Sequence, residues 1–176
     1  AQEIVQYAKK ENWQIDQIWL THAHFDHFAG VEAITRECMK PIPVGLHKAD
    51  LPLWKDMGGA KQFGLTVASG PEPTLFFEDR QILHVGESKL EVIHTPGHSP
   101  GHVCFYNAEA GVLFCGDLIF QNGIGRTDLE GGSIEELMRS IHIRVMVLPQ
   151  TTRLLCGHGP ETTVEQEQEY NPFLAD

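Results

Sequence analysis

Apolar residues recur along the chain at two different spacings, and each spacing predicts one type of element. Residues 3–12 and 31–38 place their apolar side chains on one face of a helix. Short apolar runs bounded by turn residues predict strands instead, at 15–20, 41–46, 90–94, 102–106, 112–115 and 154–156. Because helices and strands alternate, we expect an α/β fold in which helices cover the sheets.

Two helix starts carry a further signal, the capping box. Ser133 is followed three residues later by Glu136, and Thr162 is followed by Glu165 in the same way. The first box predicts a helix that continues through the apolar positions 137, 141 and 145, and the second predicts a polar C-terminal helix. Residues 50–73 show no regular pattern, apart from some helix at 51–57.

Length and composition predict one globular domain over residues 1–176, since 41% of the 176 residues are hydrophobic and 21% are charged. No apolar run reaches the roughly 18 residues of a membrane span, and no signal peptide is visible. The formal net charge of −11 argues against nucleic acid as a partner. Four cysteines without a CxxC pair predict free thiols and a cytoplasmic location.

The first candidate for chemistry is the segment at 21–27, Thr-His-Ala-His-Phe-Asp-His, directly after a predicted strand. Its imidazoles and carboxylate are all suitable ligands for a borderline metal such as zinc. Alternation puts His22 and His24 on the same side of an extended backbone. The turn into the next helix can aim Asp26 and His27 at a neighbouring point, so that one loop supplies two metals.

Three further segments follow predicted strands. His98 lies between prolines and glycines that fix a tight turn. Asp117 ends an apolar run, where a carboxylate is costly to bury unless it is paired or bound to metal, and its two oxygens can bridge two cations. His158 stands between two glycines. Together the segments supply five histidines and two aspartates, which predicts two divalent metal ions, zinc first, with iron or manganese as alternatives.

The order HxHxDH, TPGH, GD and GH resembles the metallo-β-lactamase superfamily, over a range from about Ile15 to Leu174. The resemblance implies an αββα sandwich. It also implies a first metal held by His22, His24 and His98, and a second metal held by Asp26, His27 and His158. Asp117 would bridge the two.

Within that superfamily the chain is similar to the glyoxalase II-like group, the hydroxyacylglutathione hydrolases. The motifs that carry this likeness are GRTD at 125–128, GHGP at 157–160 and NPFL at 171–174. Members of the group begin with a β-hairpin region before the first helix, so we expect this chain to lack the first strands of the sandwich. Full-length glyoxalase II also has a C-terminal helical region with basic residues for glutathione, which leaves glutathione specificity open.

The resemblance implies hydrolysis of a small thioester such as S-lactoylglutathione. Asp26 would orient the attacking water as well as bind metal, and Asp117 would hold both metals. His102 and Thr95 are expected to support the ligands through hydrogen bonds. The alternatives are a persulfide dioxygenase with one iron on the equivalents of His22, His98 and Asp117, a lactonase, and a metal-binding protein without catalysis.

Overall fold

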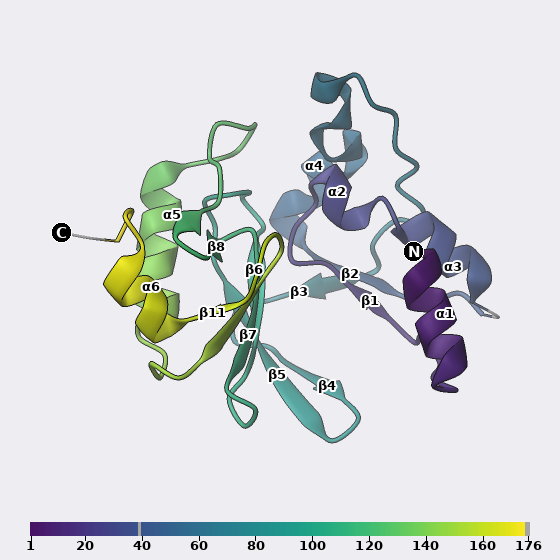
Figure 1. Ribbon diagram of the computed structural model, residues 1–176. Helices are drawn as coiled ribbons and strands as arrows, with labels where there is room; N and C mark the ends of the chain where they lie inside the picture. The colour runs from purple at the N-terminus through teal and green to yellow at the C-terminus, as the bar shows by residue number, and fades with distance from the viewer. Residues whose placement is uncertain (39, 175–176) are drawn as a thin grey trace. The chain divides into compact units, whose positions relative to one another are not determined.

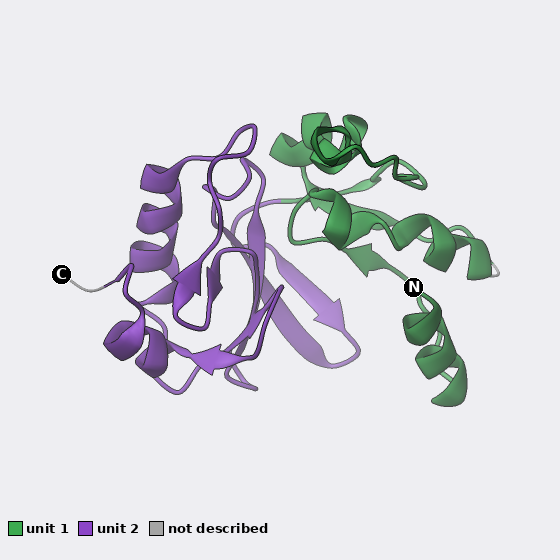
Figure 2. Cartoon of the chain, turned by 45° about the horizontal axis from the view of Figure 1, so that its top comes forward, with its two compact units in different colours: residues 1–77 green, residues 78–176 purple. Residues whose placement is uncertain are grey.

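The computed structural model describes residues 1–38 and 40–174 and divides into two compact units, residues 1–77 and 78–176 (Figure 2). The single domain over residues 1–176 stays a prediction. Within the described ranges, none of the helices combines the length and the apolar character that a bilayer crossing requires.

Unit 1, residues 1–77, is built on a parallel sheet in the order β1–β2–β3 (Figure 1). Its strands are β1 (Ile18–Trp19), β2 (Val44–His47) and β3 (Leu75–Phe77). Its helices are α1 (Gln2–Lys10), α2 (Phe25–Phe28), α3 (Val31–Glu37), η1 (Lys48–Asp50), α4 (Leu51–Lys55) and η2 (Met57–Phe63). A core of buried apolar side chains joins the sheet to α2, α3 and α4, and includes Phe28, Val31, Val44, Leu46 and Trp54.

Unit 2, residues 78–176, contains a six-stranded sheet in the order β11–β10–β7–β6–β5–β4. Its strands are β4 (Ile82–Val85), β5 (Ser88–His94), β6 (Val103–Asn107), β7 (Val112–Gly116), β10 (Arg153–Cys156) and β11 (Thr162–Thr163). A separate hairpin is formed by β8 (Ile119–Phe120) and β9 (Gly123–Ile124). The helices are α5 (Ile134–Ser140), the π-helical turn η3 (Ile141–Val145) and α6 (Val164–Tyr170).

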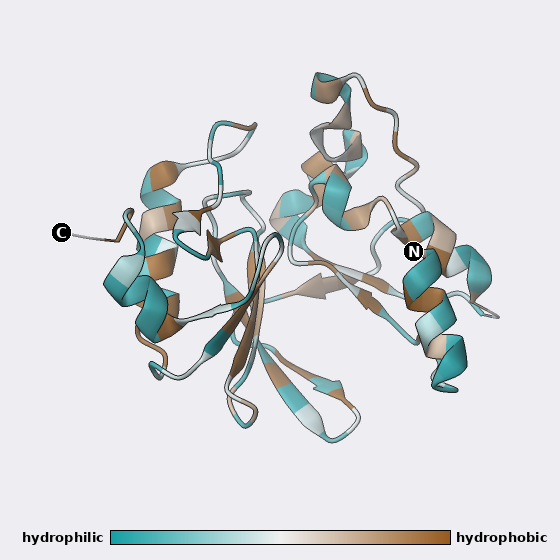
Figure 3. Cartoon of the chain, in the orientation of Figure 1, coloured by the Kyte–Doolittle hydropathy of each residue, from teal (hydrophilic) through white to brown (hydrophobic). Residues whose placement is uncertain are grey.

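The helices of unit 2 pack on its sheet through apolar side chains. The predicted positions Leu137, Ile141 and Val145 are all fully buried, against strand residues that include Leu113 and Leu154. Apolar and polar bands therefore alternate along α5 (Figure 3). The helical spacing seen in the sequence is thus confirmed, although its second half winds as a π-helix.

Three strands of the unit 2 sheet point the same way. β5 and β7 are each antiparallel to β6, and β10 is parallel to β7. The carboxyl ends of β5, β7 and β10 therefore lie at one edge of the sheet, and each is followed by a predicted ligand: His98, Asp117 and His158. The prediction that the ligand loops follow strands is confirmed.

Several predicted boundaries need correction. The first helix ends at Lys10 rather than residue 12, since Asn12 has a φ of 54° and leaves the helical region. β1 occupies only Ile18–Trp19 of the predicted 15–20, and β2 lies at Val44–His47 rather than 41–46.

The first predicted helix start is confirmed with Ser133 as its N-cap, but the reciprocal half of the box is absent, because the Ser133 N–H donates to the Gly97 carbonyl at 2.8 Å. The second predicted cap is wrong by one residue. The Ser133 hydroxyl accepts the Glu136 amide hydrogen at 3.3 Å. For α6, however, the cap is Thr163, whose hydroxyl accepts the Gln166 amide hydrogen at 3.2 Å. The Thr162 hydroxyl is used elsewhere, because it donates to the buried Glu167 carboxylate at 2.6 Å.

All four cysteines are free thiols, as predicted. Cys104 and Cys115 are buried, whereas Cys38 and Cys156 are partly exposed. Burial raises the pKa of the Cys104 thiol to about 12 and raises the pKa of Cys115 well above its usual range. Since the thiolate is the reactive form, the two buried cysteines are inert core residues.

Candidate metal centre

The HxHxDH segment of unit 1 lies between β1 and α2. His24 is extended, with φ −71° and ψ 147°, and is the N-cap residue of α2, so that Asp26 and His27 fall in the first turn of this helix. A ligand nitrogen of His22 lies within 4.8 Å of one in His24 and of one in His27. Nε2 of His27 is 3.7 Å from Oδ2 of Asp26. The structure thus brings the four predicted donors of this loop together.

Neighbouring residues hold this loop in place. The backbone N–H of Ala23 donates to Oδ2 of the buried Asp50 at 2.9 Å. Gly58 packs so closely that a Cβ there would lie 2.6 Å from the Ala23 carbonyl oxygen and 2.3 Å from the Phe25 nitrogen. The sequence interpretation missed both Asp50 and Gly58. Only the double glycine at 58–59, in an otherwise irregular stretch, offered a signal.

In unit 2 the predicted ligands meet around Asp117. Its Oδ2 lies 3.7 Å from Nε2 of His98 and 3.5 Å from Nε2 of His158. Asp117 is buried, while the His158 side chain is 56% exposed. The same carboxylate oxygen, Oδ2, therefore lies near an imidazole nitrogen of each histidine, whereas the predicted bridge would use both oxygens. The bridging role of Asp117 stays a prediction.

The tautomer of His98 follows from its second ring nitrogen. Nδ1 lies 2.8 Å from the carbonyl oxygen of Arg126, which can only accept a hydrogen bond, so Nδ1 carries the hydrogen. The lone pair is then on Nε2, the nitrogen that faces Asp117. Donation of the other ring N–H to a carbonyl is the usual arrangement for a metal-binding histidine.

The loop that supplies this carbonyl is itself well anchored. Arg126 donates to both oxygens of Asp128, at 2.8 and 2.7 Å, and the two side chains form an ion pair. The guanidinium lowers the pKa of Asp128 to about 2. Gly125 has no room for a side chain, because a Cβ would lie 1.9 Å from the Asp117 carbonyl oxygen.

His102 supports Asp117 from the backbone side. Its Nε2 accepts the Asp117 amide hydrogen at 3.1 Å, so Nδ1 carries the ring hydrogen and donates to the Thr95 hydroxyl at 2.9 Å. His102 and Thr95 are both fully buried. The expected hydrogen bonds of these two residues are therefore present, directed at the backbone of the ligand rather than at its side chain.

The surroundings of His158 connect to the C-terminal helix. Phe120, in β8, has its ring 6.2 Å from that of His158, centre to centre. The turn after β8 is tied to α6, because the buried Glu167 accepts hydrogen bonds from the Asn122 backbone and from the Asn171 side chain. Asn171, the first residue of the NPFL ending, also donates to the Gly123 carbonyl. The C-terminal motif thus supports the hairpin beside His158.

The distances in unit 2 suit a metal. In a tetrahedral zinc site, ligand atoms about 2.1 Å from the ion are about 3.4 Å apart. The separations of 3.5 and 3.7 Å from Asp117 to the two histidines are close to this value and longer than hydrogen bonds. Nitrogen and oxygen donors fit zinc, and also iron or manganese. The donors of each unit therefore fit divalent metal ions.

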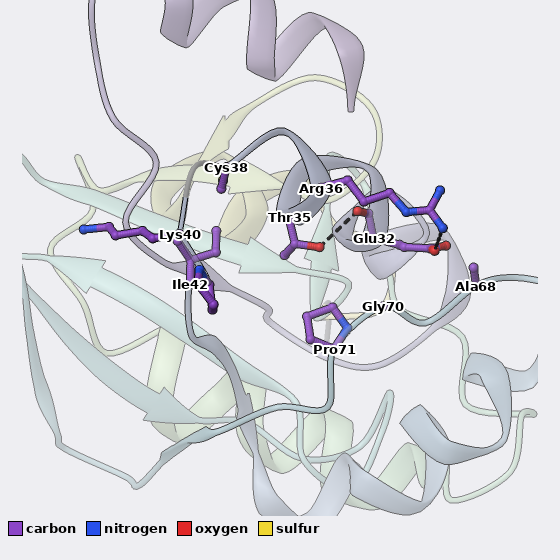
Figure 4. Close-up of a pocket in the computed structure, with 10 residues that line it drawn as sticks. Glu32, Thr35, Arg36, Cys38, Lys40, Ile42, Ala68, Gly70 and Pro71 are labelled. Atoms are coloured by element: carbon purple, nitrogen blue, oxygen red, sulfur yellow. Dashed lines mark hydrogen bonds and ion pairs between the residues drawn. The ribbon is translucent and has the colours of Figure 1, made fainter.

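A surface pocket of about 590 Å³ lies elsewhere in unit 1, beside α3 (Figure 4). Its polar groups are engaged with one another, since Arg36 pairs with Glu32 and the Thr35 hydroxyl donates to the Val31 and Glu32 carbonyls. None of the seven predicted ligands is among its described lining residues. We therefore do not assign the chemistry to this pocket.

The known proteins that this chain resembles include metallo-hydrolases and metallo-beta-lactamases. The model of the metallo-beta-lactamase superfamily matches residues 1–158. A probable metallo-hydrolase of Bacillus subtilis, YqgX, is 42% identical over 98% of this chain and 82% of its own length. The hydroxyacylglutathione hydrolase GloC of Haemophilus influenzae is 34% identical over 99% of this chain and 82% of its own length. The crystal structure of BLEG-1 B3 metallo-beta-lactamase superposes with a TM-score of 0.92 and 38% identity, over 99% of this chain and 84% of that one.

Proposed function

The chain belongs to the metallo-β-lactamase superfamily and is a metallo-hydrolase, and from this premise we propose that it is a two-metal hydrolase of thioesters. Membership gives the α/β fold that the motifs implied. The thioester class rests on the motifs shared with the glyoxalase II-like group and on the similarity to the hydroxyacylglutathione hydrolase GloC.

The observation that carries the proposal is the position of the Asp117 carboxylate between His98 and His158. A carboxylate near two ligand histidines can be shared by two cations, because it has two oxygens. We propose that the loop of unit 1 completes the centre. In this assignment His22, His24 and His98 would hold the first metal, Asp26, His27 and His158 would hold the second, and both metals would share Asp117.

Two bound divalent ions supply a water whose pKa is near neutrality and stabilise the negative charge that develops on a carbonyl oxygen. Asp26 lies beside His27 at the entrance to α2 with its side chain 40% exposed, so it can accept a hydrogen bond from the attacking water and orient it. His98 keeps its Nε2 lone pair available because its Nδ1–H donates to the Arg126 backbone carbonyl. A thiolate leaves without a general acid, so the reaction needs no further proton donor.

We further propose a small-molecule substrate in the cytoplasm, with neither nucleic acid nor membrane as a partner. The four free thiols support a reducing compartment. The net charge of −11 disfavours binding to a polyanion. Zinc is the proposed metal, because nitrogen and oxygen ligands at tetrahedral separations suit it.

Elemental analysis of untagged protein, followed by a substrate panel, tests the function. We expect two equivalents of divalent metal. The rate on S-lactoylglutathione should exceed the rate on a chromogenic cephalosporin and on a lactone by about tenfold, a transition-state difference of about 1.4 kcal/mol. Metal-loaded protein that is inactive on every thioester would contradict the proposal.

The other outcomes of the panel identify different reactions. Preferred hydrolysis of the cephalosporin would indicate a β-lactamase, as the name of the BLEG-1 B3 metallo-beta-lactamase describes that protein. Oxygen uptake with glutathione persulfide, together with a single iron, would indicate a dioxygenase. Full metal occupancy with no turnover would indicate a binding protein. Each result excludes thioester hydrolysis as the main activity.

The substitution His102→Ala is expected to lower metal affinity by about 10- to 100-fold, because the Asp117 backbone loses its acceptor. His102→Gln keeps an oxygen near the position of Nε2 and should retain most of the affinity. Competition with a chromogenic chelator measures both. His142→Ala, at an exposed histidine, is the control. An unchanged affinity in folded His102→Ala would show that this hydrogen bond does not position the ligand.

A further inference from the structure

We propose that Asp50 is a positioning residue for the metal-binding loop of unit 1, acting through the hydrogen bond between its buried carboxylate and the Ala23 backbone N–H. The inference rests on the proposed metal centre. It assigns a role to a residue that belongs to none of the ligand motifs.

The sheet of unit 1 explains why Asp50 reaches this loop. β1 and β2 are parallel neighbours, and the pairing extends past β1 through a bond from the Leu20 amide to the Gly45 carbonyl at 3.0 Å. Parallel strands end at the same edge of a sheet. The loop after β1 therefore lies beside the 3₁₀ turn after β2, and Asp50 is the last residue of that turn.

Burial of a carboxylate is unfavourable unless hydrogen bonds compensate for the lost water. Asp50 is fully buried, and its Oδ2 accepts the Ala23 amide hydrogen at 2.9 Å. A hydrogen bond to an ionised acceptor is about twice as strong as one between neutral groups. An apolar residue would fill this core position without the cost of burial, which indicates that the carboxylate serves the loop.

The backbone of Ala23 connects the two ligands His22 and His24, so its position affects the orientation of both imidazoles. It lies between His22 and His24, whose side chains project to the opposite side of the extended backbone. Asp50 fixes the peptide before Ala23 through its N–H. Gly58 lies against the peptide after it, since a Cβ at 58 would be 2.6 Å from the Ala23 carbonyl oxygen. The two peptides that set the directions of the imidazoles are thus both held.

The test compares Asp50→Ala, Asp50→Asn and a matched control in the full chain. Asp56→Asn is the control, because Asp56 is a partly exposed carboxylate in the same unit and forms an ion pair with Lys61. Zinc affinity is measured by chelator competition, and the melting temperature of the metal-free protein is measured in parallel. If Asp50 had a merely structural role, its loss would lower the melting temperature. The zinc affinity, measured well below that temperature, would stay unchanged.

We expect Asp50→Ala to weaken zinc binding by about 10- to 100-fold, as for other groups that orient metal ligands. Asp50→Asn keeps an acceptor but loses the charge, so we expect a loss of about three- to tenfold. Asp56→Asn should match the wild type. If Asp50→Ala does not fold, the zinc affinity of Asp50→Asn tests the proposal. A folded Asp50 variant that binds zinc as tightly as the wild type overturns it.

Failure of the proposed metal centre gives a different result, because the wild-type chain itself then takes up no stoichiometric metal and the role of Asp50 falls with it. A wild type that binds metal but hydrolyses no thioester removes the proposed reaction alone, and the zinc affinities of the Asp50 variants still decide the role of Asp50. A wild type that binds two metals and hydrolyses thioesters, alongside an Asp50→Ala variant with the same affinity, removes only the role of Asp50.

Discussion

Asp117→Ala is expected to lower kcat/KM on the preferred thioester by about a thousandfold or more and to reduce metal content to one equivalent or less. The carboxylate lies within 3.7 Å of His98 and 3.5 Å of His158, so its loss affects both proposed metals. Metal ions contribute several kcal/mol to stabilising charge in the transition state, and about 4 kcal/mol corresponds to roughly a thousandfold. Steady-state kinetics and elemental analysis measure the two effects.

Two further variants distinguish an effect on folding from an effect on the reaction. Asp117→Asn keeps the shape of the side chain and the backbone bond to His102, so it should remain folded and still lose most activity. Glu109→Gln, at an exposed carboxylate in the turn after β6, should behave as the wild type. If Asp117→Asn retained both metals and full activity, Asp117 would not be the shared ligand.

The ligand loops could be predicted from the sequence because each is a short motif at the end of an apolar run. The apolar run that ends in Cys115 stops one residue before the end of β7, and the run that ends in Cys156 stops with β10. Asp117 and His158 each lie two residues after the end of their run. That both strands point the same way is a matter of long-range pairing, which local periodicity does not encode. The contact between these two side chains therefore needed the structure.

The supporting residues were harder to find for the same reason. Asp50 stands 27 positions from Ala23 and is recognised only once the pairing of β1 with β2 is known. Gly58 has a φ of 62° and touches backbone atoms, so its role depends on a close approach that no pattern of side chains reports. His102, by contrast, lies within the TPGH segment and could be predicted from its neighbourhood.

Short elements escaped prediction because a few residues carry little periodicity. β8 and β9 have two residues each, and their hairpin is fixed by Asn122 and by the bonds from α6 rather than by strand propensity. The cap of α6 was ambiguous, since both Thr162 and Thr163 are followed three residues later by a suitable partner. Thr163 is the N-cap of α6, because the Thr162 hydroxyl donates to Glu167 instead.

Gly97→Ala is expected to destabilise the protein by about 3 kcal/mol or more. Gly97 has a φ of 139°, a region that residues with a Cβ rarely adopt, and it packs against the first turns of α5. A Cβ would lie 2.2 Å from the Leu137 nitrogen and 2.3 Å from its Cα, so backbone must move. The same turn is bonded to α5, since Ser133 donates to the Gly97 carbonyl and Ser140 to that of Pro96.

Gly111→Ala is the matched control, because it isolates the backbone strain from the clash. Gly111 has a φ of 61°, and a Cβ there would meet no atom within 4 Å, so only the conformational cost of about 1–2 kcal/mol applies. At about 2–4 °C per kcal/mol, the melting temperature should fall by about 6–12 °C for Gly97→Ala and by about 2–8 °C for Gly111→Ala. Equal shifts in the two variants would mean that α5 can move away from the turn, and the His98 loop would then be less rigid than its contacts indicate.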